Sequence, residues 1–332
     1  MNNQLLDARY RILTVLNVGE VAQTYLVEDA SLPNSKFVLK QLHPASNNPQ
    51  ALKILRCLFA DEVKILELLG QEHDQIQKLV AYFEENEEFY LVQEFIPGNP
   101  LTEEILQGIP LSEDEVINLL SEILEVLVFV HSREVIHQDI KPANMIRRES
   151  DKKLVLIDFG TVKEIVTTIV GNLEYIPVEQ LHGKSQYNSD IYALGILAIA
   201  ALIGLTPNEI AILPSHKNVL TGEILWRYQI PQVNTELAKI LDKMIRFDYR
   251  KRYQSASEVL NDLKKLKNHE YEPQSRNQKK IRIVLTSIVS CIAVSVATWF
   301  FLAHNSVNNP PQLYKQGNDF NKVIQINPDS AK

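Results

Sequence analysis

The fold is decided by Val135-Ile-His-Gln-Asp-Ile-Lys-Pro-Ala-Asn-Met-Ile146. Two apolar residues lead into this stretch and two follow, so we expect a strand, a polar loop and a second strand. A polar loop between two buried strands presents its side chains to a site. Asp139 and Asn144 stand five positions apart, which lets one face a substrate hydroxyl and the other a metal ion.

A second polar motif, Asp158-Phe-Gly160, comes twelve residues after Ile146 and directly behind the apolar run Leu154-Val-Leu-Ile157. In this order and spacing, the two motifs resemble the catalytic loop, H-R-D-x-K-x-x-N, and the metal-binding loop, D-F-G, of serine/threonine protein kinases. The resemblance implies an α+β, bilobal kinase domain over residues 10–267. A small β-rich N-lobe is expected at residues 10–95 and a larger helical C-lobe at residues 98–267.

The resemblance assigns a role to each polar residue of the two motifs. Asp139 would accept the proton of the substrate hydroxyl, and Lys141 would neutralise charge on the transferred phosphoryl group. Asn144 and Asp158 would hold Mg²⁺, which bridges the phosphates of ATP. Mn²⁺ also suits a site of one carboxylate and one amide.

Lys40 interrupts the half-buried strand predicted at Phe37–Leu42, and Glu62 follows in a helix predicted over Ala51–Leu69 by its apolar periodicity. A lone lysine in a strand commonly points to solvent. The kinase resemblance instead implies that Lys40 grips the α- and β-phosphates and that Glu62 orients it by ion pairing.

The turn between the predicted strands Tyr10–Leu16 and Gln23–Val27 departs from the kinase pattern. Kinases place G-x-G-x-x-G here, and its bare backbone covers the ATP phosphates. Only Gly19 is retained, because Asn17 and Ala22 replace the outer two glycines. Asn17 tolerates a left-handed conformation, whereas Ala22 would cost about 1 kcal/mol wherever a positive φ or a close approach to phosphate is required.

The adenine site is expected at the end of a strand pair, Gln77–Phe83 and Glu88–Phe95. The resemblance implies that Glu94 and the hinge Phe95-Ile-Pro-Gly98 hold the base through backbone amides and carbonyls. It also implies a set of side chains that sandwich the ring: Leu16, Thr24, Val38 and Ile146. Ordinary core packing is the alternative for these four positions.

Two further departures concern regulation. Gln138 replaces the arginine that in kinases pairs with a phosphate on the activation segment, and Asn172 replaces a threonine that bonds the catalytic aspartate. We therefore expect that phosphorylation does not switch this chain on by the usual route. The candidate acceptors on the segment are Thr161, Thr167 and Thr168.

The C-lobe framework can also be predicted. Ser112 and Glu115 form a capping box for a helix that runs to about His131, and two further helices are expected within residues 235–267. Glu179 is expected to pair with Arg252. A helix from Ser189 to about Ile203 is apolar all round and therefore buried, with Asp190 capping the backbone of the catalytic loop.

Residues 283–303 carry no charge and would span about 31 Å as a helix, close to the thickness of a bilayer core. A buried core helix is the alternative. Four cations precede the segment, in a polar linker at residues 268–282, so the positive-inside bias puts the kinase domain in the cytoplasm. Residues 304–332 would then form an extracytoplasmic tail, in part resembling a tetratricopeptide fragment.

Composition narrows the class of partner. The net charge of −7 argues against nucleic acid, which needs a basic face, and the two cysteines have no metal-ligand spacing. The first seven residues lack the basic and apolar regions of a signal peptide. Oligomeric state stays open.

The sequence therefore predicts a membrane-anchored kinase that transfers the γ-phosphoryl group of ATP to protein Ser or Thr hydroxyls. Several of its sequence motifs, for example Ser189-Asp-Ile-Tyr-Ala-Leu-Gly195, resemble those of cyanobacterial kinases. The rival hypothesis is a pseudokinase scaffold, favoured by Gln138, Asn172 and the altered glycine turn. A receptor whose tail senses an external ligand is compatible with either.

Overall fold

The computed structural model describes residues 5–19, 22–42, 49–159 and 173–271. The chain divides into two compact units, and the first, Met1–Asn268, contains both lobes. The predicted membrane span at 283–303, the tail at 304–332 and most of the linker lie outside the described residues. Within the described ranges, no helix combines the length and the apolar character needed to cross a membrane.

The N-lobe is built on a six-stranded sheet with the order β1-β2-β3-β4-β6-β5, in which all neighbouring strands are antiparallel. Its strands are β1 (Leu5–Leu6), β2 (Tyr10–Val18), β3 (Ala22–Asp29), β4 (Lys36–Leu42), β5 (Leu79–Glu85) and β6 (Glu88–Glu94). The five predicted strands are present, although the one predicted at Gln77–Phe83 begins and ends two residues later, as β5. Only Asn86 and Glu87 lie between β5 and β6, and both have a positive φ.

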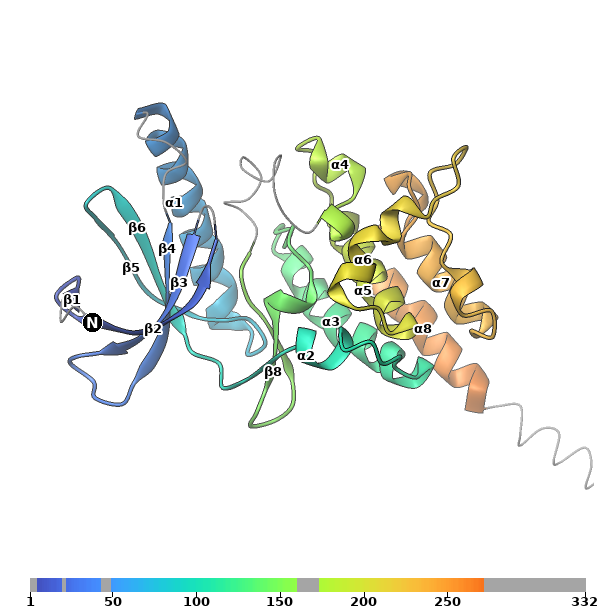
Figure 1. Cartoon of the computed structure of the whole chain (residues 1–332), viewed down its shortest axis with the longest axis horizontal. Coiled ribbons are helices and arrows are strands. Elements are labelled where there is room, and N and C mark those ends of the chain that lie inside the picture. The colour runs from blue at the N-terminus through green and yellow to red at the C-terminus, as the bar shows by residue number, and fades with distance from the viewer. Residues whose placement is uncertain (1–4, 20–21, 43–48, 160–172, 272–332) are drawn as a thin grey trace, which may run out of the picture. The chain divides into compact units, whose positions relative to one another are not determined.

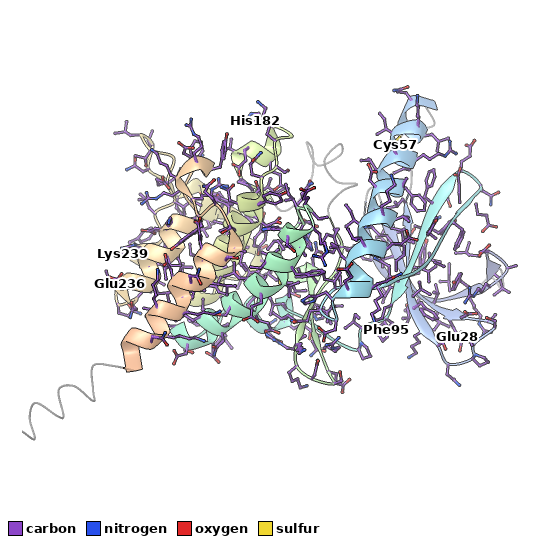
Figure 2. All side chains as sticks on the ribbon, turned by 180° about the vertical axis from the view of Figure 1, so that it is seen from behind. Glu28, Cys57, Phe95, His182, Glu236 and Lys239 are labelled. Carbon is purple, nitrogen blue, oxygen red and sulfur yellow. The ribbon has the colours of Figure 1, made fainter. Side chains whose placement is uncertain are left out.

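Helix α1 (Pro49–Glu72) runs beside this sheet (Figure 1) and packs on β5 and β6 through one apolar stripe. Phe59, Val63 and Leu66 on that stripe are buried, whereas Cys57 is exposed (Figure 2). The burial of positions three and four apart explains why the helix forms over the whole predicted range. The same stripe carries Glu62 into the interior.

A small three-stranded sheet, β7-β8-β9, lies at the start of the C-lobe and comprises β7 (Gly98–Pro100), β8 (Met145–Arg148) and β9 (Leu154–Leu156). The segment after α1 pairs with β9: Leu156 donates its amide to the Gln75 carbonyl at 2.8 Å, and Gln77 donates to the Leu156 carbonyl at 3.0 Å. These backbone bonds join the N-lobe to the strand that leads to Asp158.

The rest of the C-lobe is helical, which confirms the predicted bilobal architecture. Its α-helices are α2 (Thr102–Ile105), α3 (Glu113–Ser132), α4 (Val178–Leu181), α5 (Tyr187–Ile203), α6 (Pro207–Ile212), α7 (Thr235–Met244) and α8 (Ala256–Tyr271). The predicted capping box of Ser112 and Glu115 starts α3.

Helix α5 is the centre of the C-lobe core, packs against α3 and α7, and is buried on all sides as predicted. Gly195 lets the end of α7 approach closely. A β-carbon at this position would lie 2.6 Å from Ile245 and 3.0 Å from Met244. A larger residue at 195 would therefore push α7 away from α5.

The predicted pair of Glu179 and Arg252 is present and buried. Arg252 Nη1 lies 2.5 Å from Glu179 Oε1, and Nη2 lies 3.1 Å from Oε2. The Ser189 hydroxyl also donates to Glu179, at 2.9 Å. This bidentate contact fixes α4 to the end of the C-lobe.

One expectation about the quoted stretch is wrong. Residues 135–140 form no strand, although residues 145–148 do. The backbone amides of His137 and Gln138 donate instead to the side chain of Asp190, at 2.9 and 2.8 Å. The Asp190 carboxylate therefore accepts the backbone hydrogen bonds that a partner strand would otherwise accept.

Arg252→Met should lower the free energy of unfolding by about 3–5 kcal/mol, because it leaves the buried carboxylate of Glu179 without its cation. Arg250→Met is the matched control, since Arg250 pairs with Asp248 at the surface and should contribute less than about 1 kcal/mol. Urea denaturation of both variants followed by fluorescence makes the comparison. Equal shifts in the two would show that the buried pair contributes no more than a surface pair.

Candidate active site

Lys40 brings together three parts of the domain. Its ammonium lies 2.7 Å from Glu62 Oε1 on α1 and 3.4 Å from Asp158 Oδ1, which follows β9. Lys40 and Glu62 are both buried, so the predicted ion pair is present and is shielded from solvent. The alternative of a lysine that points to solvent is excluded.

Burial by itself would lower the pKa of the Lys40 amine, but the charges of Glu62 and Asp158 outweigh it and raise that pKa above its ordinary value. Lys40 is therefore a cation at any physiological pH. A fixed cation between two carboxylates is suited to bind the oxygens of a polyphosphate.

Asp158 adopts a left-handed backbone conformation with a φ of 55°, which is uncommon for a residue other than glycine. The next residue, Phe159, is buried, and its ring lies 4.5 Å from that of His137. The backbone turn therefore directs Asp158 toward Lys40 while Phe159 packs into the core.

The catalytic-loop side chains form a second cluster. Lys141 Nζ lies 3.2 Å from Asp139 Oδ2. Asn144 donates its amide to the same carboxylate oxygen at 2.5 Å and to the Asp139 backbone carbonyl at 2.9 Å. A short 3₁₀ turn, Pro142–Asn144, turns Asn144 back toward Asp139. The loop thus gathers Lys141 and Asn144 around the carboxylate of Asp139.

Asp190 caps the backbone of this loop, as predicted. Its carboxylate accepts the two amides of His137 and Gln138, and His131 Nε2 lies 2.9 Å from Oδ2. Asp190 itself is buried on α5. The loop geometry is therefore set by the C-lobe core rather than by a ladder of strands.

The hairpin of β8 and β9 brings the two predicted metal ligands close to each other. Met145 pairs with Leu156, and the amide of Ile157 donates to the Asn144 carbonyl at 3.0 Å. Asn144 is one partner in this contact, and Asp158 directly follows the other partner, Ile157. Their amide and carboxylate oxygens are the hard donors that Mg²⁺ and Mn²⁺ accept, so the residues present fit such a cation with nucleotide phosphates completing its shell.

The side of the site that was predicted to face the nucleotide is formed by the N-lobe sheet. Thr24 lies opposite Lys40 in the register of β3 and β4, and Val38 is two residues from Lys40, so all three point to one face. Leu16 is half-exposed and lies at a register shift of β2. Ile146, on β8, comes from the other lobe.

The altered glycine turn carries no backbone penalty at its outer positions. Among the described residues with positive φ, neither Asn17 nor Ala22 occurs, because both lie in the paired strands β2 and β3. Gly19 differs from them: its amide donates to the Ala22 carbonyl at 2.9 Å, and a β-carbon there would lie 2.9 Å from that oxygen. The one retained glycine is thus the one that sterics demand.

The predicted hinge leaves the sheet at Glu94, and Phe95 marks the crossing to the C-lobe (Figure 2). The Glu94 amide donates to the Lys78 carbonyl at 2.9 Å, and Gln77 Nε2 donates to the Glu94 carbonyl at 2.8 Å. A carbonyl has two lone pairs, so the Glu94 oxygen can accept a second bond from a base.

Sequence reasoning missed three side chains that support the site: His131 at Asp190, Gln77 at the hinge, and Gln180, whose amide donates to the Gln138 carbonyl at 2.6 Å. One hint of these contacts was present in the sequence: Gln180 directly follows Glu179, which was predicted to pair with Arg252. The predicted phosphate acceptors Thr161, Thr167 and Thr168, and also Asn172, lie outside the described residues.

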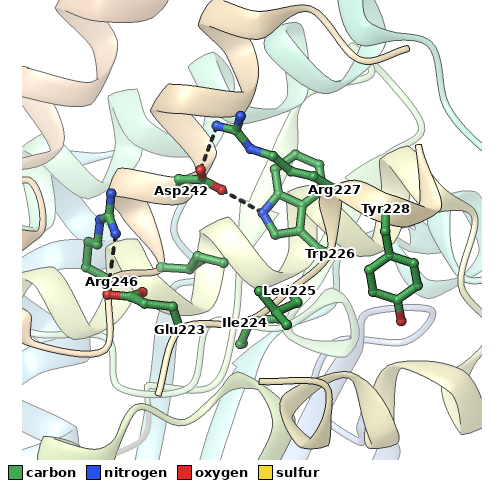
Figure 3. Close-up of a pocket in the computed structure, with 9 residues that line it drawn as sticks. Glu223, Ile224, Leu225, Trp226, Arg227, Tyr228, Asp242 and Arg246 are labelled. Atoms are coloured by element: carbon green, nitrogen blue, oxygen red, sulfur yellow. Dashed lines mark hydrogen bonds and ion pairs between the residues drawn. The ribbon is translucent and has the colours of Figure 1, made fainter. Parts of the chain in front are cut away.

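A separate cavity of about 370 Å³ lies in the C-lobe and shares no residue with the clusters above (Figure 3). Its charged groups are paired: Arg227 with Asp242 at 2.6 Å, and Arg246 with Glu223 at 3.5 Å. Trp226 also donates its indole N–H to Asp242, at 2.8 Å.

Comparison with known proteins agrees with this geometry. The family model described as protein kinase domain matches residues 10–271. Serine/threonine-protein kinase C of Synechocystis sp. is 42% identical over 273 residues, which cover 78% of this chain and 50% of the relative. For serine/threonine-protein kinase PknA of Nostoc sp., identity is 41% over 273 residues, covering 78% and 48%.

Among solved structures, the kinase domain of Mycobacterium tuberculosis PknI matches with a TM-score of 0.60 and 21% identity, over 78% of this chain and 95% of that chain. At this identity the match supports the fold alone.

The chain belongs to the protein kinase family. More particularly, residues 10–271 form a protein kinase domain of the bacterial serine/threonine type. The chain spans about half the length of the curated relatives it matches.

Glu62→Gln should reduce kcat/KM for ATP by about 10- to 100-fold, because Lys40 loses the charge that orients it and small displacements of a catalytic group are costly. Glu67→Gln, on an exposed face of the same helix, is the control and should change nothing. Steady-state kinetics with varied ATP provides the measurement. An active-site role for the pair would be contradicted if both variants matched the wild type.

Proposed function

We propose that this chain is a membrane-anchored kinase that transfers the γ-phosphoryl group of ATP to Ser and Thr hydroxyls of proteins. The observation that carries the proposal is the buried Lys40–Glu62 ion pair, with Asp158 also in reach of Lys40. A scaffold without chemistry has no need of a desolvated cation held by two carboxylates, since buried charges are costly.

In this proposal the N-lobe residues hold the nucleotide. The fixed charge of Lys40 attracts the α- and β-phosphates, and Glu62 keeps the ammonium from moving during the reaction. Thr24, Val38, Leu16 and Ile146 enclose the adenine, and Glu94 supplies a backbone acceptor. Gly19 allows the turn to lie close to the phosphates.

The catalytic-loop residues act on the hydroxyl. Asp139 Oδ2 accepts a hydrogen bond from Asn144, which fixes the orientation of the carboxylate that would align the substrate oxygen and take its proton. Lys141, 3.2 Å from Asp139, places a positive charge where the transferred group gains negative charge. A divalent cation held by Asn144 and Asp158 would neutralise phosphate charge when bound.

The pseudokinase alternative is supported by Gln138 in place of arginine. Against it, Gln138 does not disturb the loop: its backbone amide reaches Asp190, and Asp139, Lys141 and Asn144 remain clustered. The altered glycine turn also gives it little support, because Asn17 and Ala22 are unstrained.

Asp139→Asn should reduce phosphate transfer to a generic basic protein by at least about 100-fold, because general base catalysis contributes about that factor. Asp114→Asn, on the first turn of α3 and far along the chain from the loop, is the control. Incorporation of labelled phosphate is the readout, with circular dichroism to verify folding. If folded wild type incorporates no label, the scaffold function replaces this one, and a rise of melting temperature with ATP then tests nucleotide binding.

Membrane anchoring is proposed from the uncharged segment 283–303 and the cations before it, Arg276, Lys279, Lys280 and Arg282. This orientation leaves the kinase domain in the cytoplasm, where ATP is present, and the tail at 304–332 outside.

The full chain should therefore stay in the membrane fraction after carbonate washing, whereas a chain that ends at Tyr271 should be released, because it lacks the apolar segment. Cell fractionation with immunoblotting distinguishes the two. Release of both chains would contradict the anchor, and protease protection of the kinase domain in intact right-side-out vesicles is the expected orientation control.

A further inference from the structure

The backbone of Gln138 is held on both sides of its α-carbon. Its amide donates to Asp190 Oδ1 at 2.8 Å, and its carbonyl accepts from Gln180 Nε2 at 2.6 Å. The residue has a φ of 66°, in the left-handed region that non-glycine residues seldom adopt. Such a conformation persists only where the surroundings hold it, and these two hydrogen bonds do so.

The second bond acts directly on Asp139. The Gln138 carbonyl and the Asp139 amide belong to one peptide unit, which is planar. Fixing the direction of the carbonyl therefore fixes the orientation of the bond that enters Asp139. A side-chain amide on α4 thus sets the starting direction of the proposed catalytic base.

Gln180 is itself well anchored. It follows Glu179, whose carboxylate is bound by Arg252 and Ser189 in the core of the C-lobe. The backbone N–H of Gln180 also donates to the Pro177 carbonyl, at 3.1 Å. The hydrogen bond to Gln138 therefore joins two fixed bodies, the α4 segment and the catalytic loop.

The side chain at position 138 does not provide this connection. Gln138 replaces an arginine, and its Oε1 is buried with no hydrogen-bond partner in the described part of the chain. The loop is joined to α4 through its backbone carbonyl instead, a contact that needs no phosphate.

We propose that Gln180 is a positioning residue for phosphoryl transfer, which orients Asp139 through the peptide unit of Gln138 and Asp139. This inference rests on the proposed kinase function. It adds a side chain that touches neither nucleotide nor hydroxyl, yet sets the geometry of the residue that does.

The test uses the full chain with Gln180→Leu, which keeps the bulk and removes the donor, and Gln254→Leu as the matched control. Gln254 is exposed and donates to the backbone carbonyls of Tyr249 and Arg252, so the control removes the same kind of bond away from the loop. We expect kcat to fall about tenfold in Q180L, with KM for ATP within about twofold of wild type, because one orienting bond is lost and the nucleotide contacts remain. Q254L should keep the wild-type kcat.

Gln180→Glu supplies a readout that a merely structural role would not move. Its carboxyl can donate to the Gln138 carbonyl only when protonated, and as a carboxylate it repels that oxygen. The ratio of its kcat to that of wild type should therefore rise as pH falls, whereas the ratio for Q180L should stay flat.

Equal kcat values for wild type and Q180L, or a flat pH ratio for Q180E, would overturn this inference alone. A wild type without Asp139-dependent transfer would overturn the proposed function together with it. The control measurement on Asp139→Asn separates the two outcomes.

Discussion

The ammonium group of Lys40 links the two lobes through its ion pairs with Glu62 and Asp158. It holds a carboxylate from α1 and another from the residues after β9, so the strand, the helix and the C-lobe hairpin meet at one charge. A buried cation costs free energy unless it is paired, and here Glu62 and Asp158 together offset that cost. Any movement of α1 that withdrew Glu62 would leave both partners undercompensated. The same interaction that stabilises the arrangement therefore defines the proposed phosphate site.

A second set of buried charges fixes the catalytic loop independently of any substrate. Asp190 accepts two loop amides, and Glu179 with Arg252 fixes α4, whose Gln180 reaches the same loop. Two residues of the site, Gln138 and Asp158, have positive φ, which costs on the order of 1–3 kcal/mol each. The C-lobe core thus holds strained backbone where the chemistry is proposed, and this preorganisation is what positioned catalytic groups require.

Much of this could be predicted from the sequence. The apolar run around Lys40 predicted β4, and the apolar periodicity of residues 51–69 predicted α1. The motif resemblance predicted the pairing of Lys40 with Glu62, which spacing alone does not determine. The lead-in strand predicted from Val135 and Ile136 was wrong, because a short apolar run cannot reveal that a side chain 52 residues away from Gln138 will satisfy the backbone. Gln180 and Gln77 were missed for the same reason, since polar contacts between distant segments leave no periodic signal. The membrane span and the activation segment stay predictions, because they lie outside the described residues.

The most direct test of the central claim is the affinity for Mg²⁺–ATP, measured by isothermal titration calorimetry on wild type, Lys40→Met and Asp139→Asn. If Lys40 is the phosphate anchor and Asp158 a metal ligand, wild type binds ATP with a Kd between about 1 μM and 1 mM, the usual range for enzyme substrates, and more tightly with Mg²⁺ than without. Lys40→Met should weaken binding by at least about tenfold, the factor that corresponds to one charge-assisted contact, while Asp139→Asn binds as wild type does. Binding that is absent in wild type, or that is indifferent to both Lys40 and Mg²⁺, would contradict the account.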